Sequence, residues 1–221
     1  MAVIISHNHA GYQWVRRNMT ASMYNGAYYY SREIVKNIIP RIKTDRSWLT
    51  INVQGAGINH AIVFIHNNKD TLQYEWLKTY NDLILVCGIP ETCDKVAHLG
   101  TPIYLPLSVD VDYVEQYASE KNKETAYCGR ASKMRGYHFP EGTDIISELP
   151  RQQMLQAMAR YKKVYAVGRC AIEAKILGCE VLPYDERFPD PKIWKILDNK
   201  DAAKILQREL DRIDGAYDST K

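Results

Sequence analysis

The chain has 221 residues, of which 46% are hydrophobic and 25% charged, and a formal net charge of +3. This length allows one large domain or two small ones with a buried core, and the mild positive charge permits an anionic partner without requiring one. Because no apolar run approaches the ~20 residues that cross a bilayer and the N-terminus has no signal-peptide pattern, we expect a cytoplasmic protein without a membrane span, in the host cytoplasm if it is viral.

The cysteines and tyrosines indicate the cellular setting and the surface chemistry. The five cysteines lack the paired spacing of a zinc site, and four lie in or beside apolar runs. This pattern is typical of reduced core thiols in a cytosolic protein, so we expect no structural zinc. Sixteen tyrosines against three phenylalanines favour half-wet surfaces that bind sugars or bases, although drift in composition explains the count equally well.

The N-terminal segment combines an apolar run with histidines and a glycine turn. Residues 1–6 are predicted to form a strand, and His7 and His9 follow at its carboxyl end. A histidine there could act as a general base, because the pKa of imidazole lies near neutral pH; a flexible histidine pair is the alternative. Gly26 lies in an Asn-Gly turn before an apolar helix over 31–39, a place that a phosphate or donor sugar can approach.

Strands and helices alternate over the rest of the first half, which predicts a parallel α/β sheet. The glycine loop at 54–57 lacks the GxGxxG spacing and the acidic residue about twenty positions on, so a dinucleotide-binding fold is not supported. His66 directly follows one of the strands. The predicted strands are 48–53, 61–65, 82–87 and 102–106, and the predicted helices are 71–80 and 90–99.

The second half opens with a polar stretch at 119–124 that makes a credible linker. A strand at 125–128 leads into a basic loop that contains a glycine. This loop is either part of a binding site or an ordinary solvated loop. A further strand is predicted at 144–147, and a helix begins at Pro150. The loop residues of interest are Gly129, Arg130, Lys133 and Arg135.

A strand–turn–helix–strand pattern covers residues 162–185. Gly168 ends the first strand, and Gly178 ends the helix from the C′ position. Glu173 lies early in that helix, near the edge where open α/β sheets bind ligands. Its carboxylate could accept both hydroxyls of a ribose; the alternative is a solvent-facing glutamate stabilised slightly by the helix dipole. The predicted strands are 164–167 and 180–183, and the predicted helices are 170–177 and, near the C-terminus, 201–214.

Three short motifs resemble glycosyltransferases of the GT-B fold. The run Glu173–Val181 is similar to the E-A-x-x-x-G-x-x-V pattern of their nucleotide-sugar-binding domains, and residues 103–110 are similar to the I-P-N-G-V-D run that leaves their N-terminal domain. Gly129, Arg130 and Lys133 match the G-R and lysine that follow the first strand of their C-terminal domain. The chain departs from the pattern at Tyr165, where many retaining members carry a second glutamate.

The resemblance implies an α/β fold of two small Rossmann-like parallel-sheet domains facing a cleft. An N-terminal acceptor-side domain would span 1–118 and a nucleotide-sugar-binding domain 119–200. The helix and tail over 201–221 would pack back on the sheet.

The resemblance also implies roles for individual residues. Arg130 and Lys133, with Arg135 as an extra cation, would hold the diphosphate, because departure of a nucleoside diphosphate develops negative charge on its terminal phosphate. Glu173 would hold the ribose. One of His7, His9 and His66 would face the acceptor, and the remaining substrate-binding residues would be Gly26, Gly129, Gly168 and Arg169.

The implied activity is transfer of a sugar from a nucleotide diphosphate sugar, expected to be a UDP-sugar, to an acceptor hydroxyl. We expect neither a metal nor a cofactor beyond the donor, because cations would replace the metal and the DxD-like run 110–112 falls in the interdomain exit. The small basic chain also fits a phage-type enzyme that glycosylates modified bases in DNA, with phosphate contacts from Arg16, Arg17 and residues 41–46.

Two alternatives from other classes stay open. A non-catalytic nucleotide or nucleic-acid binding module would keep the fold and lose the chemistry, and Tyr165 favours it. A sugar-nucleotide epimerase shares the architecture and would change the donor without an acceptor. The sequence does not specify an oligomeric state.

Overall fold

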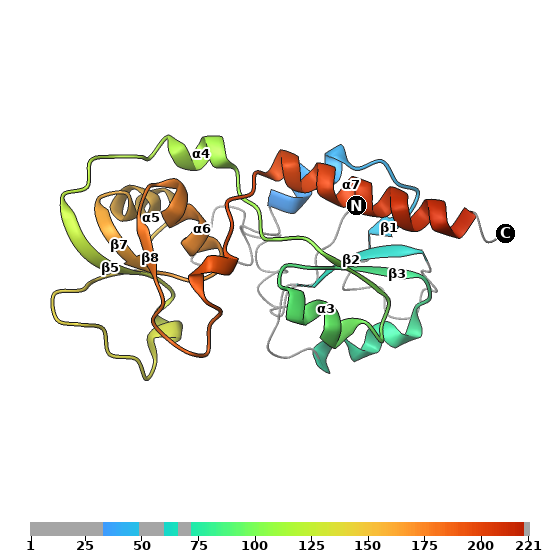
Figure 1. Ribbon diagram of the computed structural model, residues 1–221, viewed down its shortest axis with the longest axis horizontal. Coiled ribbons are helices and arrows are strands. Elements are labelled where there is room, and N and C mark those ends of the chain that lie inside the picture. The colour runs from blue at the N-terminus through green and yellow to red at the C-terminus, as the bar shows by residue number, and fades with distance from the viewer. Residues whose placement is uncertain (1–32, 49–59, 66–71, 219–221) are drawn as a thin grey trace. The chain divides into compact units, whose positions relative to one another are not determined.

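The computed structural model describes residues 33–48, 60–65 and 72–218 and divides the chain into two compact units (Figure 1). The described part of the first unit comprises residues up to Pro106 together with the segment from Asn199 onward. The second unit contains Leu107–Asp198. No helix within these described ranges is long and apolar enough to span a bilayer.

The first unit contains a four-stranded parallel sheet in the order β1-β2-β3-β4. β2 and β3 are buried along their whole length, as expected for central strands covered on both faces. The strands are β1 (Ser47–Trp48), β2 (Ala61–Ile65), β3 (Leu83–Cys87) and β4 (Thr101–Tyr104). The helical segments are η1 (Ile34–Ile38), η2 (Ile39–Arg41), η3 (Leu72–Thr79), α3 (Pro90–Val96) and α7 (Asn199–Asp218).

The long C-terminal helix α7 packs against η1 and η2 of the first unit. Its apolar face buries Ala202, Leu206 and Leu210, so the amphipathic helix predicted over 201–214 is confirmed and begins two residues earlier. At its start Asn199 donates a 2.7 Å hydrogen bond to Glu33, which fixes the helix to the beginning of η1.

The second unit contains a second four-stranded parallel sheet, in the order β6-β5-β7-β8. Together the two sheets confirm the predicted α/β class with parallel strands. The strands are β5 (Lys123–Gly129), β6 (Asp144–Ser147), β7 (Tyr161–Tyr165) and β8 (Glu180–Leu182). The helical segments are α4 (Val111–Glu115), η4 (Ala131–Met134), α5 (Arg151–Met158), α6 (Arg169–Ile176) and η5 (Pro191–Ile193).

Among the described segments, the helices α5 and α6 cover one face of this second sheet, and the short η4 lies in a loop on the other face. Figure 1 shows α5 and α6 on one side and the loops over 130–143 and 183–190 on the other, as right-handed crossovers require. The loop face is filled by an aromatic cluster whose neighbouring ring centroids lie 4.8–6.3 Å apart. Its members are Tyr127, Tyr137, Phe139, Tyr165, Tyr184 and Phe188.

The ends of α6 are set by two glycines with positive φ. Gly168 precedes the helix with φ 62°, and Gly178 follows it with φ 75°. Cys179 N donates to Ala174 O at 2.9 Å and Gly178 N to Lys175 O at 3.0 Å, the pair of bonds that defines a Schellman motif. The predicted C′ role of Gly178 is therefore confirmed.

Several boundaries differ from the sequence prediction, and two of them matter for the site. The strand expected at 164–167 is β7, which begins at Tyr161 because its ladder with β5 extends back to the pair Lys123–Tyr161. The units divide after Pro106 rather than after residue 118. Val109 N donates to Leu197 O at 3.1 Å, and this contact attaches the segment after Pro106 to the second unit.

Candidate functional site

The order of strands in the second unit creates a topological switch point between β5 and β7. The chain leaves β5 toward one neighbour, β6, and later returns on the other side as β7. In open α/β sheets, ligands bind outside the carboxyl ends of the strands at such a point. Two loops start at this point. Arg130 belongs to the loop after β5, and Gly168 belongs to the loop after β7.

Two cations from the loop after β5, Arg130 and Lys133, and Arg169 at the start of α6 all act electrostatically on Cys170, in the first turn of α6. Burial raises the pKa of the Cys170 thiol to about 11 and the Glu173 carboxylate adds to the rise, whereas Lys133, Arg169 and Arg130 lower it. All three cations therefore lie within electrostatic reach of one sulfur atom. The structure thus brings together cations that are about forty residues apart in the sequence.

The position of Arg130 depends on its neighbours in β5. Tyr127 Oη donates a 2.8 Å hydrogen bond to Arg130 O. A Cβ atom added to Gly129 would lie 2.5 Å from that hydroxyl oxygen, so only glycine permits this close approach. Partial burial lowers the pKa of the Arg130 guanidinium.

The basic loop after β5 is joined to the loop after β8 through an aromatic ring. Lys133 Nζ lies 5.5 Å and Arg187 Cζ 5.9 Å from the centroid of Phe188, both within cation–π range. Arg187 also donates to the carbonyl of Arg135 at 2.9 Å. The side chain of Arg135 is exposed, whereas that of Lys133 is half-buried.

Glu173 is only 4% exposed, so the interpretation as a solvent-facing glutamate is wrong. Its Oε1 accepts a 2.8 Å hydrogen bond from Arg169 Nε and lies 3.0 Å from Arg151 Nη2. Both of these contacts are made to Oε1 and not to Oε2. The carboxylate is therefore held through one oxygen and can offer the other to a ligand.

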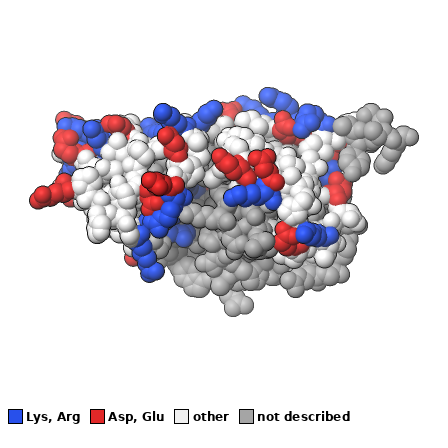
Figure 2. Space-filling view, turned by 60° about the horizontal axis from the view of Figure 1, so that its bottom comes forward, with Lys and Arg blue, Asp and Glu red and all other residues white. Residues whose placement is uncertain are grey.

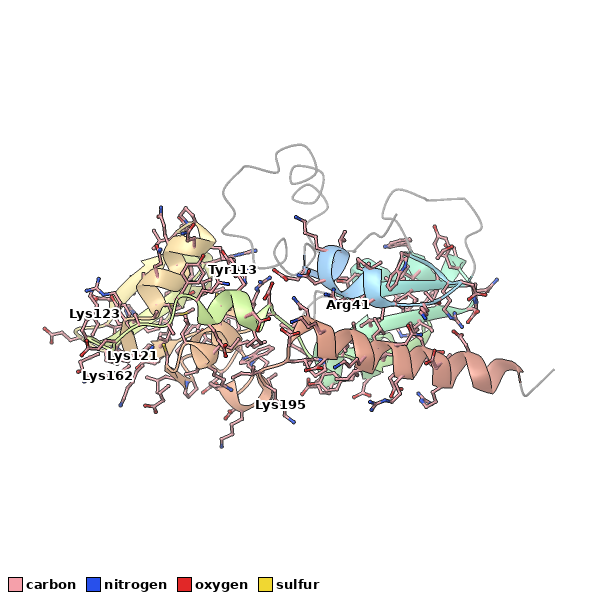
Figure 3. All side chains as sticks on the ribbon, turned by 90° about the horizontal axis from the view of Figure 1, so that it is seen from above. Arg41, Tyr113, Lys121, Lys123, Lys162 and Lys195 are labelled. Carbon is pink, nitrogen blue, oxygen red and sulfur yellow. The ribbon has the colours of Figure 1, made fainter. Side chains whose placement is uncertain are left out.

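Arg151 is a site residue that the sequence analysis missed. It is the first residue of α5, and its guanidinium packs 4.9 Å from the ring centroid of Tyr113 in α4, which is labelled in Figure 3. Its position directly after the carboxyl end of β6 was the available signal, because every segment that follows a parallel strand starts at the same edge of the sheet.

The N-terminus of α6 provides a further favourable element for an anion. No side chain caps this end of the helix, and Gly168 precedes it in a conformation that glycine adopts without strain. Uncapped N–H groups and the helix dipole favour negative charge at this position.

Two buried hydroxyl groups at the carboxyl edge have no hydrogen-bond partner within the described residues, those of Ser147 and Tyr184. Ser147 ends β6 and is paired with Gly129 of β5 in the sheet register. Tyr184 follows β8, is 4% exposed, and lies edge-to-face against Tyr127 at 5.5 Å. Burial raises the pKa of Tyr184 to about 12, so this hydroxyl keeps its proton at neutral pH.

A separate charged cluster lies at the amino ends of β2 and β3 in the first unit. Arg46 is buried and donates to Asp82 Oδ1 at 3.1 Å and to Asp214 Oδ1 at 2.7 Å. His60 Nδ1 lies 2.5 Å from Asp82 Oδ2, and His60 Nε2 lies 3.1 Å from Asp45 Oδ1. His60 and Asp82 both have positive φ, a strained conformation that this cluster holds in place.

The structure brings most of the predicted substrate-binding residues to one edge and leaves four predicted residues outside its description. Arg130, Lys133, Arg169 and Glu173 meet near the start of α6, whereas only the backbone of Arg135 is engaged. The predicted site residues His7, His9, Gly26 and His66, together with the predicted strand 1–6 and glycine loop 54–57, lie outside the described residues.

The described residues contain no cluster of three or more histidine, cysteine or acidic side chains suited to a metal ion. All five cysteines lie within the described ranges, and each is a free thiol. Comparison with known proteins gave no match to a family model, a curated protein or a solved structure. Any functional assignment therefore rests on the chemistry of the site itself.

Proposed function

We propose that the protein is a metal-independent glycosyltransferase that binds a nucleotide diphosphate sugar at the carboxyl edge of the second sheet, with a UDP-sugar as the expected donor. The observation that carries this proposal is the convergence of Arg130, Lys133 and Arg169 at a topological switch point. The uncapped start of α6 adds oriented N–H groups at the same place.

This arrangement matches the charge that glycosyl transfer develops. The bond between the anomeric carbon and the diphosphate oxygen breaks, and its electron pair leaves with the terminal phosphate. A new bond forms between the anomeric carbon and the acceptor oxygen, whose proton passes to a base. Cations and N–H groups fixed beside the leaving phosphate stabilise this transition state and take the part that a metal ion plays elsewhere.

Glu173 is the proposed ribose ligand, but it would bind the ribose through only one of its two carboxylate oxygens. Arg169 and Arg151 fix Oε1, so Oε2 is the acceptor for a ribose hydroxyl. The proposal also includes a GT-B-like arrangement, in which the acceptor binds on the side of the first unit. One of His7, His9 and His66 would be the base.

DNA as the acceptor has weaker support from the described surface. Arg46, expected to contact phosphates, is 1% exposed in its side chain and is bound to two aspartates. Figure 2 shows basic and acidic side chains interspersed over the described part of the visible face. A DNA acceptor would therefore depend on Arg16, Arg17 and the exposed Arg41, which is labelled in Figure 3.

A non-catalytic binding module is the second candidate, and the environment of Tyr165 favours it. The Tyr165 ring packs 5.1 Å from Phe139 in the aromatic cluster, so a packing residue stands where many of the resembling enzymes carry a glutamate. Such a module would bind the nucleotide and leave the sugar bond intact.

An assay of donor turnover separates these candidates. UDP-glucose is incubated with the protein, with and without DNA that contains hydroxymethylated bases, and both UDP release and the sugar are analysed. A transferase releases UDP and labels the acceptor, whereas a module releases none and an epimerase alters the sugar without acceptor. Binding of the donor without any turnover across a panel of acceptors and donors would overturn the assignment as a transferase.

A further inference from the structure

Three neighbouring parallel strands of the second sheet, β6, β5 and β7, each lead into an arginine at the same edge of the sheet. Arg130 is the first residue after β5, Arg151 is the fourth residue after β6, and Arg169 is the fourth residue after β7. Because adjacent strands lie about 4.8 Å apart, the ends of the three strands span about 10 Å of this edge. The three arginines therefore start from one short stretch of the carboxyl edge.

The guanidiniums of Arg151 and Arg169 meet at a single carboxylate oxygen. Arg169 Nε donates to Glu173 Oε1 at 2.8 Å, and Arg151 Nη2 lies 3.0 Å from the same atom. The side chains of Arg151, Arg169 and Glu173 are only 10%, 8% and 5% exposed. Like charges held this close repel each other, and the repulsion is stronger away from water. An anion that contacts both guanidiniums would reduce this repulsion.

Arg151 is held at the carboxyl edge from two sides. Its guanidinium carbon lies 4.9 Å from the ring centroid of Tyr113 in α4, and α4 packs against α6, the helix that carries Glu173. The guanidinium therefore lies between an aromatic ring and a carboxylate. A guanidinium has five N–H donors in a planar fork that suits phosphate oxygens, so contact with one carboxylate oxygen does not by itself use all of them.

We propose that Arg151 contacts the phosphate oxygens of the bound diphosphate directly, as a further arginine ligand beside Arg130 and Arg169. This role rests on the proposed function and extends the anion site from the ends of β5 and β7 to the end of β6. The three arginines would then bind the diphosphate from three adjacent strands.

The test is the variant Arg151→Gln, with inorganic pyrophosphate and UDP as probes in calorimetric titration of the full chain. Affinity for both probes should fall roughly tenfold, the usual effect of losing a charge-assisted hydrogen bond. Pyrophosphate is the decisive probe because it has no ribose. If Arg151 acted only by positioning Glu173 for a ribose, affinity for UDP alone would fall, and a purely structural role would lower the thermal midpoint and leave both affinities unchanged.

Two further variants serve as controls. Arg160→Gln removes an exposed guanidinium at the opposite edge, which donates to Asn122 Oδ1 at 3.3 Å, and it should leave both affinities unchanged. Arg151→Lys keeps the positive charge and loses the planar fork, so its affinity for pyrophosphate should lie between those of the wild-type protein and Arg151→Gln.

The outcomes separate the role of Arg151 from the proposed function. Wild-type protein that binds pyrophosphate and UDP, with Arg151→Gln equal to it in affinity for pyrophosphate, overturns the direct contact and leaves the anion site standing. Wild-type protein that binds neither probe overturns both. If Arg151→Gln does not fold, NMR of the arginine Nε–H groups in the wild-type protein decides: pyrophosphate must shift the Arg151 resonance, and an unchanged resonance refutes the contact.

Discussion

His60 lies between two carboxylates, so its charge and the stability of the first unit are linked. The hydrogen bond to Asp82 raises the pKa of His60, and Asp45 adds to the shift, while partial burial and the nearby Arg46 oppose it. A group whose pKa is raised in the folded state stabilises the fold fully below its unfolded pKa of about 6.5. That contribution is lost as the pH rises through the folded pKa.

We therefore expect the free energy of unfolding to fall by about 0.5 kcal/mol between about pH 6 and about pH 9, a small effect because His60 is partly exposed. The variant His60→Asn, which tolerates the positive φ at this position, should lose this component. Urea unfolding of both proteins at the two pH values measures it. An identical pH dependence in the two proteins would refute the role of His60.

At the scale of single residues, the sequence places Arg130 and Lys133 directly after the strand that the structure describes as β5. Their role as diphosphate ligands comes from the resemblance and stays a prediction. The environment of Glu173 was not predictable, since Arg151 reaches it from a different helix. Tyr184 escaped notice for the same reason: its burial depends on packing against five other aromatic rings.

At the scale of elements, Lys121 joins the ends of two helices. Its Nζ donates to Ala159 O at 2.7 Å and to Leu177 O at 2.5 Å, carbonyls at the C-termini of α5 and α6. A lysine there satisfies carbonyls that lack helical partners and interacts favourably with both helix dipoles. Figure 3 labels it among the lysines at the amino edge of the second sheet.

Lys121→Met should therefore lower the free energy of unfolding of the second unit by about 2 kcal/mol, since two charge-assisted hydrogen bonds are lost. Lys162→Met is the matched control, because that exposed lysine forms an ion pair with exposed Glu124, and its loss should change stability by less than about 0.5 kcal/mol. Urea unfolding gives both values, and equal effects of the two variants would contradict the capping role.

Elements with a strong apolar pattern were predicted well. A helix with an unusual number of residues per turn was not. β2, β3 and α5 lie close to their expected positions, because long apolar runs and the faces of ordinary helices are local signals. The segment expected as a helix at 71–80 forms the 3₁₀ helix η3. The buried residues Tyr74 and Leu77 of η3 and Tyr80 just after it are three apart, which fits three residues per turn and leaves Trp76 only partly buried.

At the scale of the whole molecule, the part of the chain from residue 33 onward passes between the two units after Pro106 and again after Asp198. The polar stretch at 119–124 suggested a linker, but it is part of the second unit, where Lys123 begins β5. Composition alone could not reveal this, because the solvent-exposed start of a strand and a linker contain the same kinds of polar residue. The return of α7 to the first unit likewise depends on contacts with η1 and η2.

The central claim is that the carboxyl edge of the second sheet binds a nucleoside diphosphate. A thermal-shift screen of the purified protein against UDP, GDP, ADP and their sugar conjugates tests it most directly, with Arg130→Ala and Glu173→Ala as site variants. Arg160→Ala, an exposed cation that precedes β7 at the opposite edge, is the control. A ligand at a hundred times its dissociation constant should stabilise the fold by about 2.7 kcal/mol, a shift of a few degrees.

We predict a shift with one nucleotide that persists in Arg160→Ala and disappears in both site variants. Absence of a shift with every nucleotide, or a shift that the site variants retain, would contradict it.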